Sequence, residues 1–129
     1  MALDWTTADD WQRRAWVAEH ALGWLPFASV QASLPAGYLA SPGTMWPPSW
    51  RRAQEGRLPP NYVGDWQAWR VIVDHMRAQG YAFGLKDTAV GKVRAQFKQP
   101  GNVGVAIMDS EGAAVCVAAL RAVGQIVTA

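Results

Sequence analysis

The segment of residues 113–120, AAVCVAAL, contains no polar side chain. Ser110 precedes it as a helix N-cap and Gly124 follows as a stop, so the sequence predicts a last helix here. A helix that is apolar all round must be covered on every side. We therefore expect a sheet to cover one side of this helix. The other side must be covered by the first predicted helix (about residues 8–22), the long loop (residues 24–64) or a second copy of the chain.

Three segments before this helix predict strands, because their apolar residues alternate with polar ones. They are YAFGLKD (81–87), GKVRAQFKQ (91–99) and NVGVAIM (102–108). In the third, the apolar residues of one face are Val103, Val105 and Ile107. The QPGN tetrapeptide between the second and third is a tight-turn signature. Short connections and a period of two favour an antiparallel meander.

Two further helices are predicted upstream of the strands. The first covers about residues 8–22, with Thr7 as its cap. Its apolar stripe is Ala8, Trp11, Ala15, Ala18 and Leu22. On this register Trp16 and His20 fall on the opposite side, where Trp16 would need a second contact surface.

The second of these helices covers about residues 66–79, between a cap at Asp65 and a stop at Gly80. Its predicted apolar stripe is Trp66, Trp69, Ile72, Val73 and Met76. The expected order is helix, long loop, helix, three strands, helix. This is an α+β fold, and we expect residues 1–129 to form one domain.

The long loop, residues 24–64, has no periodicity and contains seven of the eight prolines. A loop of this length in a compact domain usually indicates function or hidden short elements.

Composition excludes several classes of protein. The single cysteine, Cys116, cannot form an intrachain disulfide, and no apolar run reaches membrane-spanning length. The opening residues are polar and acidic, unlike a signal peptide, so we expect a cytoplasmic protein without a membrane partner. The net charge of +2 is small, which disfavours nucleic acid as a partner. Eight tryptophans are many for one small core, so we expect at least two to be partly exposed.

Three segments resemble the phage ABA sandwich domain, a family of small proteins encoded by phages and prophages. They are WVAEHALGW, LPPNYVGDWQAWRVIVDHM and GVAIMDSEGAAVCVAALRAVG. The matching positions are Val17, Ala18, Glu19, Gly23 and Trp24, then Pro60, Tyr62, Asp65, Ala68 and Trp69, and finally Ala114, Cys116, Ala118, Ala119 and Leu120. Positions that differ from the family pattern are His20, Ala21 and the longer loop at 28–44. The resemblance implies an α+β fold and a phage origin, and it brings no catalytic motif.

No pattern for catalysis or metal binding is present, so we expect neither an enzyme nor a cofactor. His20 and His75 have no zinc-binding spacing, and the interpretation we favour is that both are exposed and non-catalytic. Cys116 lies inside the apolar helix, which is typical of a small core residue. GxSxG, Walker and GxGxxG motifs are all missing.

The loop segment MWPPSWRRAQEGRLPPNYVGDW instead suggests a binding site. Its prolines reduce the entropy cost of ordering, its tryptophans and tyrosine offer stacking faces, and its arginines can hold phosphate. For each tryptophan taken singly, filling the core is the interpretation we favour. For the loop as a whole we favour a binding role, because filling the core needs no cluster of three arginines. The predicted ligand-binding residues are Trp46, Trp50, Arg51, Arg52, Arg57, Tyr62 and Trp66.

Lys86, Lys92, Arg94 and Lys98 share one face of the first two strands. An ordinary solvated face with edge lysines that deter aggregation is the interpretation we favour, and a phosphate-attracting face is the alternative.

Our first hypothesis for function is a non-catalytic phage or prophage protein. It would sequester a small phosphorylated molecule, such as a nucleotide signal used in host defence. The alternatives are an interaction protein that inhibits a host enzyme through exposed Trp16 and the loop, and a nucleic-acid accessory protein that uses the basic sheet face. We also expect a homo-oligomer, at least a dimer, that buries part of the last helix and Trp16.

Overall fold

Helix α4, Glu111–Ala122, lies at the centre of the molecule and is covered on every side by the same chain. The computed structural model describes residues 2–34, 36–38, 43–48 and 56–129. Ser110 caps α4 as predicted, since its hydroxyl accepts a hydrogen bond of 3.2 Å from the Ala113 N–H. Every residue from Gly112 to Leu120 is buried. Because one chain supplies this cover, the apolar helix no longer requires a second copy, and the oligomer stays a prediction.

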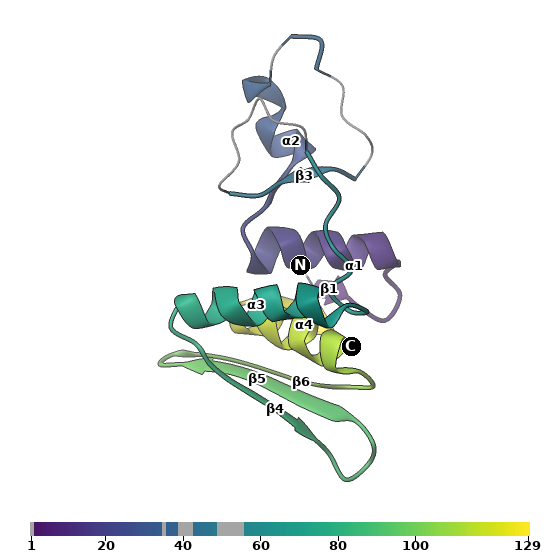
Figure 1. The fold of residues 1–129 in the computed structure, drawn as a ribbon, viewed down its shortest axis with the longest axis vertical. Helices are drawn as coiled ribbons and strands as arrows, with labels where there is room; N and C mark the ends of the chain where they lie inside the picture. Colours follow the sequence, from purple (N-terminus) through teal and green to yellow (C-terminus); the bar gives the residue numbers. More distant parts are fainter. Residues whose placement is uncertain (1, 35, 39–42, 49–55) are drawn as a thin grey trace.

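A three-stranded antiparallel sheet covers one side of α4 (Figure 1). Its strands are β4 Ala82–Asp87, β5 Val93–Gln99 and β6 Asn102–Met108, in that order. The predicted meander and the α+β fold class are thereby confirmed.

The register of the sheet separates an inner face from an outer face. Phe97 pairs with Phe83 on one side and with Gly104 on the other, and these residues face α4 with Ala95 and Ala106. The alternate residues of the three strands point away from α4 and form what we call the outer sheet face. Its residues are Ala82, Gly84 and Lys86 of β4, Arg94, Gln96 and Lys98 of β5, and Val103, Val105 and Ile107 of β6. The apolar face predicted for β6, Val103, Val105 and Ile107, therefore points away from the core.

Helix α3, Trp66–Ala78, packs beside α4 on the same side of the sheet (Figure 1). The predicted cap at Asp65 is confirmed, because the Asp65 carboxylate accepts a 2.9 Å hydrogen bond from the Gln67 N–H. The buried residues of the helix are Ala68, Ile72, Val73 and Met76. The predicted place of Trp66 in the buried stripe is wrong, since Trp66 is 56% exposed. The buried stripe is centred on Ile72, which leaves Trp66 on the flank of the helix.

The first helix departs from its prediction in register. Helix α1 spans Asp10–Trp16, with Asp9 rather than Thr7 as its cap, and it continues as a π-helical turn over Val17–Ala21. The bond from the Leu22 N–H to the Val17 carbonyl, 3.1 Å, closes this wider turn. The extra residue in the turn rotates the following residues relative to α1. Val17 and Ala21 are buried there together with Ala18 and Leu22, the two buried residues of the predicted stripe. Trp11, ahead of the turn, is 51% exposed, so its predicted place in the stripe is wrong. Trp16, predicted on the opposite side, is half-buried against the core.

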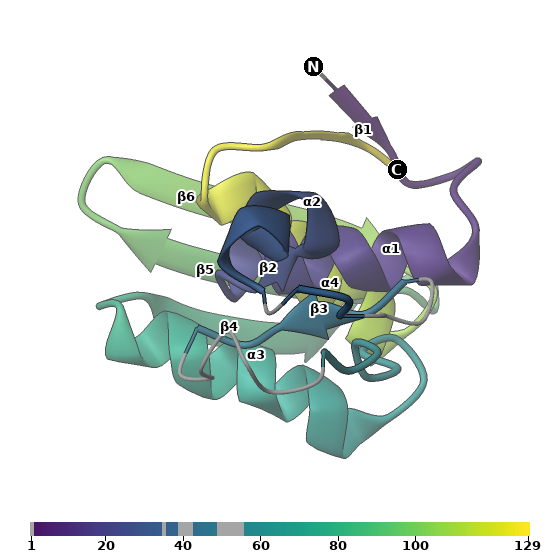
Figure 2. The same cartoon turned by 90° about the horizontal axis from the view of Figure 1, so that it is seen from above.

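The proline-rich segment forms a lobe on the far side of α1 from the sheet (Figures 1 and 2). Strands β2 Leu25–Pro26 and β3 Met45–Trp46 pair antiparallel within it. A short helix α2, Phe27–Val30, leads into a 3-10 turn at Gln31–Ser33. The expected hidden short elements are thus present in this loop.

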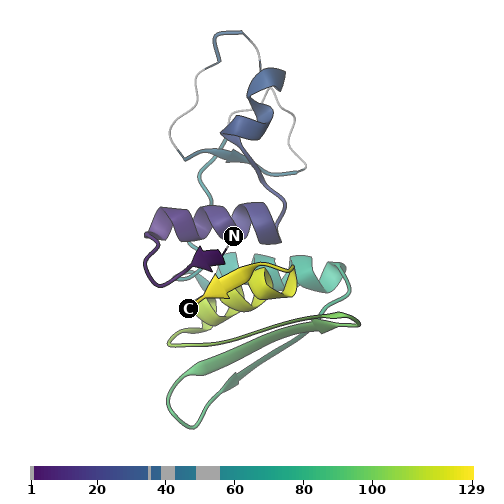
Figure 3. The ribbon, with the colours of Figure 1, turned by 180° about the vertical axis from the view of Figure 1, so that it is seen from behind.

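The two ends of the chain meet in a short parallel pair that sequence periodicity does not predict. Strand β1, Ala2–Asp4, pairs with β7, Ile126–Thr128 (Figure 3). Leu3 and Val127 are the buried residues of the pair. Within the described part of the chain, no helix is both long and apolar enough to cross a bilayer.

Candidate ligand-binding sites

Trp46, the first of the predicted binding residues, lies in the interior of the lobe. Its side chain is fully buried, with the rings of Phe27 and Tyr38 centred 6.2 and 6.1 Å away. A Cβ added at Gly56 would lie only 3.0 Å from the Trp46 ring, so the chain packs tightly against it. In this conformation Trp46 packs the lobe and offers no open face for stacking.

The other predicted residues of the loop are dispersed. Trp50, Arg51 and Arg52 lie outside the described residues. Arg57 is exposed and its backbone pairs with Met45 of β3, while its guanidinium lies 4.8 Å from the Trp24 ring. Tyr62 is buried, and its hydroxyl has no hydrogen-bond partner in the described structure. Burial also raises the pKa of Tyr62 well above its ordinary value. A ligand-binding role for the whole set stays a prediction.

Trp66, by contrast, belongs to a cavity of about 210 Å³ between α3 and β4, which we call the tryptophan–arginine pocket. Six of its lining residues recur at helical spacing on one side of α3, and the seventh comes from the start of β4. They are Trp66, Trp69, Arg70, Val73, Asp74, Arg77 and Phe83.

Two guanidinium groups lie over aromatic rings of this pocket. Arg70 is 6.0 Å from the centre of the Trp66 ring, and Arg77 is 6.0 Å from the centre of Phe83. That distance is the outer limit of a cation–π contact, so neither group is held firmly by its ring. Asp74 lies about one helical turn from each arginine. Among the described residues, however, none of these three side chains forms an ion pair within 4.0 Å.

These groups can recognise a planar anionic molecule. The rings of Trp66, Trp69 and Phe83 offer faces for stacking, and a guanidinium can hold a phosphate or carboxylate through two parallel hydrogen bonds. The carboxylate of Asp74 can accept hydrogen bonds from ring N–H groups. The cavity is smaller than pockets for drug-sized ligands. It therefore suits one ring system, with the charged part of the ligand left at the rim.

A second cavity, of about 480 Å³, brings together the only two histidines of the chain. In this two-histidine cleft, His20 comes from the π-helical turn, His75 from α3, and Gln79 directly follows α3. Gln99 comes from β5, and Pro48 of the lobe forms part of the wall. The cleft thus lies where the lobe, the π-helical turn, the end of α3 and the sheet meet, the kind of junction at which ligand pockets form.

The predicted exposure of both histidines is corrected by this cleft, because each is half-buried within it. Tertiary packing causes the difference, since the π-helical turn and α3 carry the two side chains to the same wall. The Nε2 atom of His20 lies 3.6 Å from the carboxylate of Glu19. No group of three or more metal-ligating side chains occurs among the described residues. Imidazole and amide groups can hydrogen-bond a polar ligand here.

Cys116 is buried inside α4, in agreement with its predicted place in the core. Burial raises the pKa of its thiol, which disfavours the reactive thiolate.

Comparison with known proteins gives a match in fold. The sequence matches no protein-family model, and no curated protein matches it significantly. A crystal structure of a phage protein from Bacillus cereus ATCC 14579 superimposes with a TM-score of 0.62 at 13% sequence identity. The match covers 95% of this chain and 99% of that protein. The chain therefore has the fold of a phage protein over nearly its whole length.

Proposed function

We propose that this protein is a non-catalytic phage or prophage accessory protein that binds a small phosphorylated molecule with a planar ring. A nucleotide is the simplest ligand of that class. The tryptophan–arginine pocket carries the proposal, because it combines exposed aromatic faces with two guanidinium groups free of ion pairs among the described residues. In it, Trp66 stacks on the ring, and Arg70 and Arg77 hold the phosphate.

The phage origin rests on the shared fold and on the resemblance to the phage ABA sandwich domain. A phage protein that binds a nucleotide without turning it over can sequester a signal used in host defence. We propose this role in the host cytoplasm. Trp50, Arg51 and Arg52 are proposed as further ligand contacts from the loop.

The direct test is titration of a nucleotide panel with the wild-type protein and with Trp66→Ala and Arg77→Gln. Loss of a stacking aromatic is expected to weaken binding by roughly ten- to a hundredfold. Trp11→Ala is the matched control, because Trp11 is 51% exposed and lies under a guanidinium, that of Arg14 at 4.5 Å, yet belongs to α1. Equal weakening by both tryptophan variants would contradict the proposed pocket.

The non-catalytic part of the proposal is tested on the recovered ligand. After incubation, mass spectrometry is expected to find the bound nucleotide chemically unchanged. His20→Ala and His75→Ala are expected to leave binding intact. If the wild-type protein converted the nucleotide and either variant abolished this conversion, the two-histidine cleft would instead be an active site.

A second candidate function is inhibition of a host protein through the exposed side of α3. Trp66 and Val71 are both more than half exposed there, and tryptophan and arginine dominate binding energy at protein interfaces. The half-buried Trp16, proposed for this role from sequence, is packed against the core instead. This function would be favoured if the wild-type protein captured a host protein, Trp66→Ala abolished that capture, and the wild-type protein bound no nucleotide.

A further inference from the structure

The outer sheet face carries a local charge that the small net charge of the chain conceals. Lys86 of β4 lies directly opposite Arg94 of β5, and Lys98 lies further along β5 on the same face. None of the outward-facing residues of these three described strands is acidic. Lys86, Arg94 and Lys98 also form no ion pair within 4.0 Å among the described residues. Three uncompensated positive charges therefore share this face.

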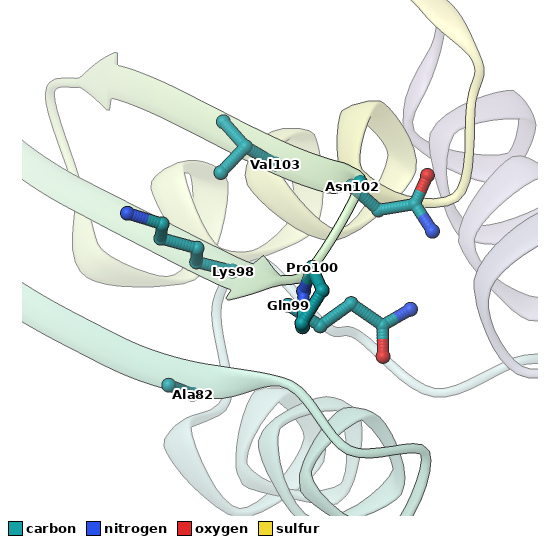
Figure 4. Close-up of a pocket in the computed structure, with 7 residues that line it drawn as sticks. Ala82, Lys98, Gln99, Pro100, Asn102 and Val103 are labelled. Atoms are coloured by element: carbon teal, nitrogen blue, oxygen red, sulfur yellow. The ribbon is translucent and has the colours of Figure 1, made fainter.

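Two adjoining cavities hollow the same face. One, of about 520 Å³, lies at the turn between β5 and β6, and the other, of about 380 Å³, lies over β4 and β5. Both are lined by Ala82 and Lys98, so they adjoin, and we call the two together the trough. Figure 4 shows Lys98 and Val103 on neighbouring strands, with Pro100 and Asn102 at the turn end of this trough.

The trough has an apolar border. Val103 and Ile107 of β6 are each 51% exposed, and no side chain stands between them and Arg94 or Lys98 on the paired strand. Small residues on the other border, Ala82 and Gly84, leave the trough open, since a Cβ added at Gly84 would meet no atom within 4 Å. Lys86 of β4 and Arg94 and Lys98 of β5 thus lie beside the apolar border of β6. This arrangement fits a polyanion that also has apolar groups.

We infer that the outer sheet face binds single-stranded nucleic acid, with the three cations on its phosphates and the apolar border against its bases and sugars. A duplex fits less well, because its bases are stacked inside and cannot enter the trough. A second copy of this face would place like charges against one another, which is destabilising. No aromatic side chain lies on the outward-facing positions of these strands, so binding is expected to be weak and independent of sequence.

The salt dependence of the binding affinity tests this inference directly. Neutralising three phosphates on a single strand gives a slope of log affinity against log salt of about −2. We would measure it by fluorescence anisotropy with a labelled mixed-sequence DNA single strand. The duplex of the same sequence and a poly-glutamate peptide serve as competitors. The triple variant Lys86→Gln/Arg94→Gln/Lys98→Gln is expected to abolish binding, and each single variant to reduce the slope by about 0.7.

Lys92→Gln is the matched control. Lys92 precedes β5 and lies near the same face, but its Nζ atom is 2.6 Å from the carboxylate of Asp109, so its charge is already paired. It is expected to keep the slope and affinity of the wild-type protein. The Trp66→Ala variant is also expected to bind the DNA single strand with the affinity of the wild-type protein. This result would separate the outer sheet face from the tryptophan–arginine pocket.

Three outcomes would overturn the inference. They are no binding at low salt, equal binding by a folded triple variant, and competition by the duplex or the acidic peptide as strong as that by the single strand. Thermal melts of each variant establish that it is folded, and exposed substitutions of this kind usually change stability little.

Discussion

Gly104 of β6 lies directly against Ala118 of α4, so closely that a Cβ on Gly104 would be 2.0 Å from the Ala118 carbonyl oxygen. The backbone of Ala122 is nearly as close, with its nitrogen 2.3 Å from that Cβ position. The small residues of α4 thus serve a purpose beyond hydrophobicity, because they let the helix approach the sheet backbone. This close approach also explains why the larger apolar residues of β6 face outward.

Gly104→Ala is therefore expected to destabilise the protein. The added methyl group meets backbone atoms, which cannot move without shifting α4, and overpacking of this kind typically costs about 1–3 kcal/mol and occasionally more. Chemical denaturation measures the change. Gly84→Ala in β4 is the control, since its Cβ would meet nothing within 4 Å. If both variants were equally stable, the packing of α4 against β6 would be wrong.

Tyr62→Phe is expected to leave stability unchanged or to raise it. The Tyr62 hydroxyl is buried without a hydrogen-bond partner in the described structure, and removal of an unsatisfied buried polar group recovers a desolvation cost of about 1–3 kcal/mol. A clear loss of stability would mean that the hydroxyl has a hydrogen-bond partner.

Stability is expected to fall as the pH rises above the ordinary pKa of a thiol, about 8.5. Burial raises the pKa of Cys116 in the folded state, so the unfolded chain ionises first and is favoured at high pH. The limiting slope from this one group is about 1.4 kcal/mol per pH unit. Denaturation from about pH 7 to 10 measures it, and Cys116→Ala is expected to flatten the slope. An unchanged slope in that variant would assign the pH dependence to other groups, with Tyr62 as the next to test.

The sequence predicts those elements whose pattern is long enough to repeat. Helix α3, the three-stranded sheet and α4 each contain at least six residues with regular spacing, and all are found near the predicted positions. Strands β2 and β3 have two residues each, too few for any period. Strand β1 is defined by its pairing with β7 at the other end of the chain, which periodicity does not reveal.

The candidate sites likewise combine residues whose spacing along one element is visible in the sequence with residues that only tertiary packing brings together. Trp66, Trp69, Arg70 and Arg77 lie on one side of a helix, and their spacing is visible in the sequence. That Phe83 closes their pocket depends on how β4 returns along α3. The meeting of His20 with His75 depends on the π-helical turn and on tertiary packing, which have no signature in this sequence.

Trp46→Ala is expected to destabilise the protein by about 3–5 kcal/mol, because truncation of a fully buried tryptophan leaves a large cavity. Most of the loss should be in the lobe, since the ring neighbours of Trp46 are Phe27 and Tyr38. Thermal melts give the overall change, and hydrogen exchange shows whether Phe27–Val30 loses protection before α4 does. Trp66→Ala is the matched control, with a side chain that is 56% exposed and an expected change within about 0.5 kcal/mol. A Trp46→Ala variant that melts like the wild-type protein yet loses ligand affinity would show that Trp46 leaves the interior to contact the ligand, as the sequence alone suggests.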